Sequence, residues 1–309
     1  MASSKSIKNR IKSTKSIKQI TKAMEAVSAV KMRKSEQVAL RARPYALAAL
    51  EVLRGLTAKM DNDFSSLSPL LDQTRSDQPN CLLVITSDKG LAGSFNTNVL
   101  RKALKIVNND PTLEVIAVGK KGRDFLSRRG AKIISGYTGA GDFVELRETE
   151  PISKFVKDGF EQGKWSKVTL LYTNFLSALK QEVVARKVLP FDFKSLTSII
   201  EGITPTRGKY ANMPQVLGVD QKESAYSYEP NASIILDKLL PTLLEIEIHH
   251  AVLEGNASEH SSRMVAMRNA SENAGELIDS LTLEYNKARQ AQITKELTEI
   301  TGGAAALEM

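Results

Sequence analysis

The sequence predicts an α/β fold in which a domain with a mainly parallel sheet lies between two long helices, which pair as an antiparallel coiled coil. Three patterns predict it: apolar or small residues recur every three or four positions near the amino terminus, short β-branched runs alternate with helical stretches in the middle, and a heptad repeat follows. We expect an N-terminal coiled-coil helix over residues 1–60, an α/β domain over 79–225 and a C-terminal coiled-coil helix over 231–309.

The first segment is expected to form one long helix that ends near residue 58. Its apolar or small residues are spaced so that they share one helix face, which we expect to be buried against a partner helix. They are Ile7, Ile11, Thr14, Ile17, Ile20, Met24 and Val27. The first residue able to kink this helix is Pro44, and Gly55 lies near its end.

The central segment alternates short apolar strands with helical stretches. Strands are predicted at Cys81–Thr86, Leu113–Val118, Ala131–Ser135, Val168–Tyr172 and Glu182–Leu189. Helices are predicted at Asn96–Asn108, Gly122–Arg129 and Ile152–Gly163. This alternation favours a Rossmann-like domain, whose mainly parallel sheet is covered on both faces.

The last segment begins apolar on several sides and then narrows to a single seam. Residues 233–254 are apolar enough to be buried on more than one side. Beyond them, residues follow the alternating three- and four-residue steps of a coiled coil. They are Met264, Met267, Ser271, Ala274, Ile278, Leu281, Tyr285 and Ala288. A helix that covers a sheet usually has a wider apolar face, so this seam favours pairing with the first helix. Gly302 and Gly303 are expected to loosen the helix.

Positive charge is concentrated at the amino terminus. Residues 1–34 hold ten lysine or arginine side chains and one acidic residue, Glu25, which gives this segment +9 in a chain of net charge +8. A segment this basic implies an acidic partner, which is nucleic acid, anionic lipid or an acidic protein surface. Residues 1–22 also match the composition of a mitochondrial transit peptide, although lysine outnumbers arginine and the pattern runs on to residue 34.

The histidines and the single cysteine do not predict a catalytic or metal site. His249, His250 and His260 do not converge along a helix, so they are expected to be solvated or to contact a partner. Cys81 begins an apolar strand and is expected to be a core residue in a reducing compartment. No apolar run approaches the roughly 18 residues that span a bilayer.

Glycine-containing loops are the remaining sign of a ligand. The loop Thr86–Asn96 follows a strand and contains Gly90 and Gly93, but it matches neither the dinucleotide pattern GxGxxG nor the phosphate loop GxxxxGK[ST]. We therefore assign no cofactor, no metal and no catalytic residue.

Three segments closely resemble one protein family. They are SIKNRIKSTKSIKQITKAMEAVSAVKMRKSE, the loop TSDKGLAGSFN, and RMVAMRNASENAGELIDSLTLEYNKARQAQITKELTEITGGAAAL. Together they resemble the gamma subunit of bacterial-type rotary ATP synthases, in the expected order over nearly the whole chain. The resemblance implies a central rotor shaft that couples rotation of the membrane c-ring to conformational change in the catalytic beta subunits, without a catalytic site of its own.

The resemblance also implies partners, a location and contact residues. The partners would be the alpha and beta subunits of the hexameric head, the epsilon subunit and the c-ring, with no nucleic acid. The protein would be peripheral, on the cytoplasmic face of the bacterial inner membrane. Contacts with levers and catch loops of the beta subunits would come from Lys18, Lys22, Met24, Lys31, Arg33, Lys34, Lys89, Arg289, Gln290 and Thr294. An apolar bearing would be formed by Ala304, Ala305, Ala306 and Leu307.

Two other classes of protein remain as alternatives. A basic helical nucleic-acid-binding protein would explain the first helix, although no aromatic residue precedes Tyr45 to stack on bases. A Rossmann-type nucleotide-binding enzyme would explain the central domain, and it should bind NAD or ATP in isolation.

Overall fold

The computed structural model describes residues 4–58, 68–139, 141, 144–191 and 232–307, with only the backbone for 40–58, 232–233 and 302–307. The expected domain limits at residues 225 and 231 lie outside these ranges.

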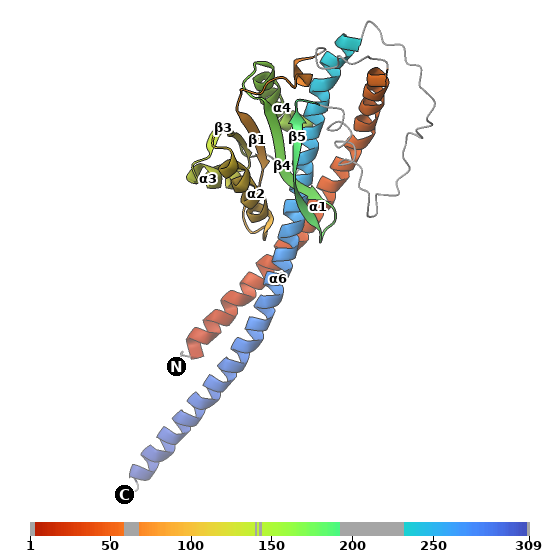
Figure 1. Ribbon diagram of the computed structural model, residues 1–309. Coiled ribbons are helices and arrows are strands. Elements are labelled where there is room, and N and C mark those ends of the chain that lie inside the picture. The colour runs from red at the N-terminus through yellow and green to blue at the C-terminus, as the bar shows by residue number, and fades with distance from the viewer. Residues whose placement is uncertain (1–3, 59–67, 140, 142–143, 192–231, 308–309) are drawn as a thin grey trace. The chain divides into compact units, whose positions relative to one another are not determined.

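Contacts divide the chain into two units. Unit 1 comprises Met1–Ser28 and Arg263–Met309, and unit 2 comprises Ala29–Ser262. Two long helices run through both units, α1 (Ser4–Ala58) and α6 (Ala232–Leu307) (Figure 1).

Unit 2 is built on a five-stranded sheet with the strand order β3-β2-β1-β4-β5. The strands are β1 (Asn80–Ile85), β2 (Glu114–Val118), β3 (Lys132–Tyr137), β4 (Lys167–Phe175) and β5 (Gln181–Leu189). All neighbouring strands are parallel except β4 and β5, which form an antiparallel hairpin. The mainly parallel sheet predicted from the sequence is therefore confirmed.

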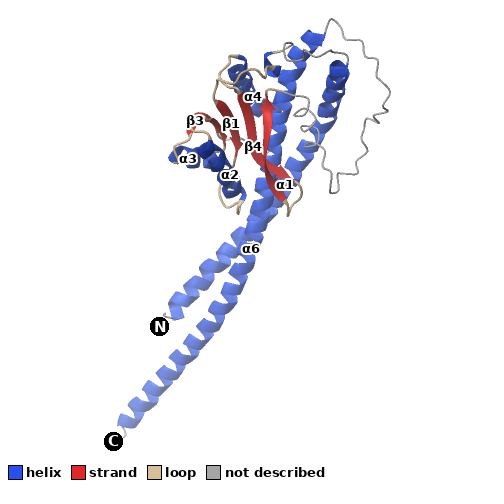
Figure 2. Ribbon diagram, in the orientation of Figure 1, coloured by secondary structure: helices blue, strands red, loops and turns tan. Residues whose placement is uncertain are grey.

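Helices cover both faces of this sheet (Figure 2). They are α2 (Phe95–Asn109), α3 (Lys120–Arg128) and α4 (Leu146–Glu161), with the short 3-10 helix η2 (Pro69–Leu71). Helices α2 and α3 pack on one face, whereas α4 and the first half of α6 pack on the other. Helix α4 begins six residues before the expected Ile152, because Glu145 and Glu148 cap its first turn reciprocally.

Unit 1 is an antiparallel pair of helices. Arg268 Nε of α6 donates a hydrogen bond of 3.0 Å to Glu25 Oε1 of α1. Gly275 lies seven residues after Arg268, and Lys18 lies seven residues before Glu25. These two also meet, because a Cβ on Gly275 would lie 3.0 Å from Lys18 Nζ. The α6 seam positions from Met264 to Ala288 are all buried or half-buried. The predicted antiparallel coiled coil is therefore confirmed.

The buried face of α1 differs from the stripe expected from the sequence. Ile7, Ile11 and Thr14 are buried or half-buried as expected, and Met24 is half-buried. The expectation is wrong for three residues, because Ile17, Ile20 and Val27 are more than half exposed. Their places in the seam are taken by Thr21, Glu25 and Ser28, which are buried. The side chains that meet α6 are thus smaller and more polar than the most apolar face of α1.

Helix α6 continues beyond its paired stretch. Each residue from Arg289 to Thr301 is exposed, and the register places Ser4 of α1 near the start of this stretch. We call residues 289–307 the overhang, a single helix about 28 Å long at 1.5 Å per residue. The helix passes through Gly302 and Gly303 to Leu307, so these glycines do not end it.

The turn from β2 into α3 depends on a glycine. Gly119 has a φ of 94°, and a Cβ there would lie 2.2 Å from the backbone oxygen of Thr86. The Thr86 hydroxyl donates to Val118 O at 2.9 Å and accepts from Gly122 N at 2.9 Å. This close approach joins the ends of β1 and β2.

We predict that Gly119→Ala destabilises the protein more than Gly130→Ala does. Both glycines have positive φ, but a Cβ at Gly130 would meet nothing within 4 Å. The free energy of unfolding of the Gly130 variant should therefore fall only by the cost of holding a side chain in the left-handed conformation, about 1–2 kcal/mol. The Gly119 variant should cost about 2 kcal/mol more because of the collision. Urea unfolding of both variants checks this, and equal midpoints would contradict it.

Candidate functional site

Lysines of α1 gather beside α6 in unit 1. Lys18 and Lys22 are exposed, and together with Gln19 and Ala23 they form one wall of a shallow pocket. Ser271 and Glu272 of α6 form the other wall. Of the residues expected to contact partners, Lys18 and Lys22 line this pocket, and Met24 lies half-buried on the next turn of the same helix.

Glu25, at a buried position of the seam, binds one lysine of this group and an arginine of α6. The residue is only 8% exposed, and its two carboxylate oxygens accept from different helices, one from Lys22 Nζ at 3.1 Å and one from Arg268 Nε at 3.0 Å. The hydrogen bond from Arg268, followed by that from Lys22, lowers the pKa of Glu25 below its ordinary value of 4.5. A charged residue at a seam position fixes the register of a helix pair, so Glu25 sets how α1 and α6 align.

An exposed apolar strip lies on α1. Ile17, Ile20 and Val27, with the half-buried Met24 among them, follow steps of three and four residues and so share one face. The sequence pattern found this face but predicted that it would be buried. Exposed aliphatic residues that line up in this way indicate a surface for another protein.

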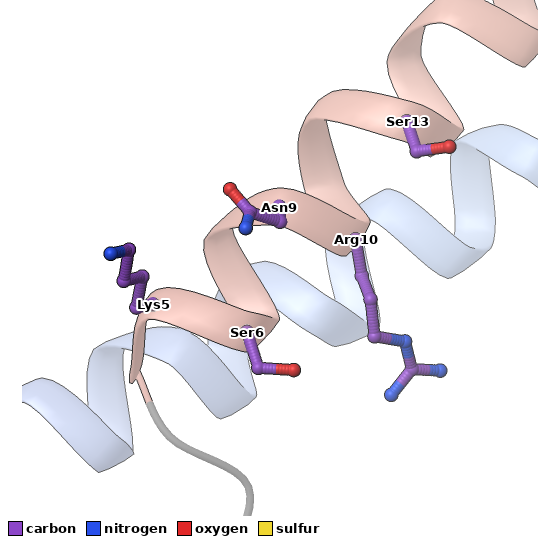
Figure 3. Close-up of a pocket in the computed structure, with 5 residues that line it drawn as sticks. All are labelled: Lys5, Ser6, Asn9, Arg10 and Ser13. Atoms are coloured by element: carbon purple, nitrogen blue, oxygen red, sulfur yellow. The ribbon is translucent and has the colours of Figure 1, made fainter.

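Polar residues line a second shallow pocket near the start of α1. They are Lys5, Ser6, Asn9, Arg10 and Ser13, all exposed and all from the first turns of the helix (Figure 3). The pocket adds to the basic character of this end of the helix pair. Sequence reasoning counted its charges but did not single it out.

The overhang carries the contact residues expected near the carboxyl terminus. Arg289, Gln290 and Thr294 are exposed there. The side chains of Ala304, Ala305, Ala306 and Leu307 lie outside the described residues. The overhang also exposes Ile293, Leu297 and Ile300, at 49%, 58% and 69%. Sequence reasoning missed these three, although their steps of four and three residues were the available signal.

Threonines of the overhang use their hydroxyl groups internally. Thr294 donates to Gln290 O, Thr298 to Thr294 O and Thr301 to Leu297 O, at 2.8 to 3.0 Å. These hydroxyl protons are already bonded within the helix, so the threonines present mainly their methyl groups outward. The overhang surface is therefore more apolar in its contacts than its sequence suggests.

The remaining expected contact residues belong to unit 2. Arg33, Lys34 and Lys89 are exposed there, and Lys31 is half-buried. Lys89 lies in the loop between β1 and α2.

The loop after β1 lies at the carboxyl edge of the parallel strands, where open α/β sheets bind ligands. Asp88 Oδ1 accepts from Lys120 N at the start of α3, and Asp88 Oδ2 accepts from Gly139 N after β3, each at 2.7 Å. In Rossmann-type domains, helix amides at this edge bind phosphate. Here the amide of Lys120 in α3 is bonded to a carboxylate of the chain itself, whereas the phosphate turn of a Rossmann-type domain leads from the first strand into the next helix, which is α2 in this chain.

The histidines differ from the expectation, whereas the cysteine agrees with it. His249, His250 and His260 are all buried, so their expected exposure is wrong. His249 Nδ1 lies 3.1 Å from Thr149 Oγ1, and burial lowers the pKa of this histidine. Cys81 is fully buried and burial raises its pKa, which confirms the predicted core position. Among the described residues, no cluster of His, Cys, Asp and Glu could hold a metal ion.

Exposed lysines and aliphatic residues on paired terminal helices define a protein that acts through contacts with partner proteins. A family model described as ATP synthase matches residues 3–307. The ATP synthase gamma chain of Pelotomaculum thermopropionicum is 42% identical over 100% of both chains. That of a Roseiflexus species is 42% identical over 99% of each. The chain thus belongs to the family of ATP synthase gamma chains.

Solved structures agree with this assignment. A chain from the central stalk and c-ring of the Tetrahymena thermophila mitochondrial ATP synthase has a TM-score of 0.56 and 25% identity, covering 82% of this chain and 99% of its own. A chain from the Euglena gracilis mitochondrial enzyme has a TM-score of 0.63 and 21% identity, covering 97% of this chain and 93% of its own. The second likeness concerns the fold alone. Within the described residues, no helix has the length and apolar character to cross a membrane.

We predict that Leu281→Asp separates the helix pair, whereas Leu283→Asp does not. Leu281 is 3% exposed and Leu283 is 66% exposed. An unpaired charge at the buried site should cost about 3 kcal/mol, and at the exposed site less than about 0.5 kcal/mol. Hydrogen exchange should then show lost protection in residues 4–28 and 263–288 together in the Leu281 variant. Loosening of α6 alone would contradict the pairing.

We also predict that protonation of Glu25 at low pH weakens the helix pair. The pKa of Glu25 is lowered in the folded state, so its stabilisation is present above the unfolded pKa, near 4.5, and is lost as pH falls below it. Glu25→Gln should remove this dependence at a cost of about 1 kcal/mol at neutral pH, because both partner cations are largely exposed. Exchange protection measured from pH 3 to pH 7 tests this, with the exposed Glu276→Gln as the control.

Proposed function

We propose that this chain is the central rotor shaft of a proton-translocating ATP synthase. It couples rotation of the c-ring to conformational change in the catalytic beta subunits of the hexameric head, and it has no catalytic site of its own. The observation that carries the proposal is the antiparallel helix pair with its overhang, in a chain related to gamma chains over its full length.

A shaft must transmit torque without slipping along its own length. The interlocking seam makes the pair stiff, and the bond between Glu25 and Arg268 resists sliding of one helix along the other. A stiff, asymmetric pair can force each beta subunit in turn through its nucleotide affinities. The chain would therefore act by shape and not by bond chemistry.

The overhang suits a bearing inside the alpha–beta hexamer. Ile293, Leu297 and Ile300 present aliphatic side chains, and the threonine hydroxyl groups donate within the helix. Rotation would then break few hydrogen bonds to the surrounding sleeve. Small apolar groups at Ala304, Ala305, Ala306 and Leu307 would continue this surface to the tip.

The basic residues suit transient contacts with acidic levers of the beta subunits. Exposed ion pairs contribute only about 0–1 kcal/mol each, so a passing lever can be released. We assign this role to Lys18, Lys22, Lys31, Arg33, Lys34 and Lys89, with Met24 as the uncharged face between them. Arg289, Gln290 and Thr294 would meet the catch loops.

The remaining partners would be the epsilon subunit and the c-ring, which we assign to unit 2. The protein would then be peripheral, on the cytoplasmic face of the bacterial inner membrane.

We predict that Ile293→Asp with Leu297→Asp impairs the complex but not the free chain. Both side chains are exposed in the free chain, so its unfolding should not change. If a sleeve buries them, each loss should cost about 1.5 kcal/mol or more, which is about tenfold in affinity. The measurement is magnesium-ATP hydrolysis after reconstitution with an alpha–beta hexamer, with Leu179→Asp, an exposed leucine of the β4–β5 turn, as the control.

Reconstitution also tests the function itself. Hydrolysis that depends on adding wild-type chain, which is inactive alone, is the expected result. Failure of the wild-type chain to bind the hexamer would refute the shaft. Full activity of the double variant would refute only the bearing.

A further inference from the structure

A buried polar cluster lies where the first half of α6 crosses the sheet, and the proposed function does not use it. Glu247, His250 and Glu254 follow steps of three and four residues on α6 and are all buried. On the sheet side of the same packing are Tyr172 of β4, fully buried, and Arg186 of β5, half-buried. Ionisable groups at this density are rare inside a packing interface.

Glu247 is the least satisfied member of the cluster. It is 5% exposed, and both its carboxylate oxygens are buried without a hydrogen-bond partner among the described residues. An ionised carboxylate in such a place loses its hydration and gains no hydrogen bond in return. The fold therefore favours the uncharged form of this side chain.

Among the described residues, the cation that acts on Glu247 makes no hydrogen bond to it. The guanidinium of Arg186, 5.6 Å from the ring centre of Tyr172, acts on Glu247 only through its field. His250 Nδ1 lies 3.9 Å from Glu254 Oε2, beyond hydrogen-bond distance. Glu254 and Glu247 both raise the pKa of Tyr172, which burial raises most.

We propose that Glu247 is a proton-binding site inside the rotor, and that release of its proton loosens the contact between α6 and the β4–β5 hairpin. Helix α6 runs on from this contact into the helix pair. The proton on Glu247 thus controls how firmly the shaft helix is held by the α/β unit. The site is independent of the contacts assigned above to the beta subunits.

The sign of the effect follows from the direction of the shift. Burial raises the pKa of Glu247 from 4.5 to about 8, against the opposing field of Arg186. An acid whose pKa is raised in the folded state stabilises the docked state fully when the pH is below its unfolded pKa. This stabilisation is lost as the pH rises to its folded pKa. The opening constant of the contact should therefore grow about tenfold per pH unit until pH 8.

Other groups at this contact titrate differently. Burial lowers the pKa of His249, which makes docking stronger as pH rises through the acidic range, the opposite sign. Glu245 also has a raised pKa, from partial burial and the nearby Glu150. Measurements above pH 6.5 avoid the titration of His249. A Glu245 variant separates the effect of Glu245 from that of Glu247.

The first experiment detects the proton directly on the full chain. Infrared spectroscopy at pH 6.5 should show the carbonyl stretch of a buried, protonated carboxylic acid, which disappears as pH rises past about 8. Glu247→Gln should abolish the band, and Glu245→Gln should keep it. Absence of the band from the wild-type chain would overturn the proposal without any variant.

The second experiment detects the loosening. Hydrogen exchange of residues 235–255 and of β5, corrected for intrinsic rates, should show protection in the wild-type chain falling about tenfold between pH 6.5 and 7.5. Glu247→Gln should flatten this fall and Glu245→Gln should not. Protection that is unchanged with pH in the wild-type chain would refute the coupling, as would an unaltered slope in Glu247→Gln.

Discussion

The close approach of α1 and α6 is the constraint on which unit 1 depends. The α1 side of the seam presents Thr14, Thr21 and Ser28, which let the helix axes come near, while α6 contributes Met267 and Leu281. Small side chains bury little apolar area each, so stability comes from a long interlocked contact and not from a few large residues. The Glu25–Arg268 hydrogen bond adds a directional contact to this seam.

Helix α6 meets two different neighbours, and its composition changes accordingly. Between Leu243 and Leu253 it is buried on most of its circumference, because the sheet and α4 surround it. From Met264 onward only a narrow seam is buried, because one helix covers it. One continuous helix thus has a half that packs on the sheet and a half that packs on a single helix.

Several polar side chains are buried although the sequence pattern predicts that they are exposed. Glu25, Glu247 and the three histidines are buried, although periodicity assigns such residues to solvent. Each needs a partner or a proton to be buried, and for Glu25 and His249 a distant part of the chain supplies a partner. Arg268 is remote from Glu25 in sequence, as is Thr149 from His249.

The sequence by itself determined the fold class, the α6 seam and the core position of Cys81. It also placed all five strands, and every strand end lies within two residues of the expected one except the end of β4, which is three residues later. These depend on local periodicity and β-branched runs, which one segment carries alone. Only the tertiary structure decided which face of α1 is covered. Ile17, Ile20 and Val27 form a better apolar stripe than the buried residues, but α6 selects the face that permits close approach and supplies Glu25 for Arg268. A helix pattern shows that an apolar face exists, whereas the shape and charge of the partner helix determine which face is buried.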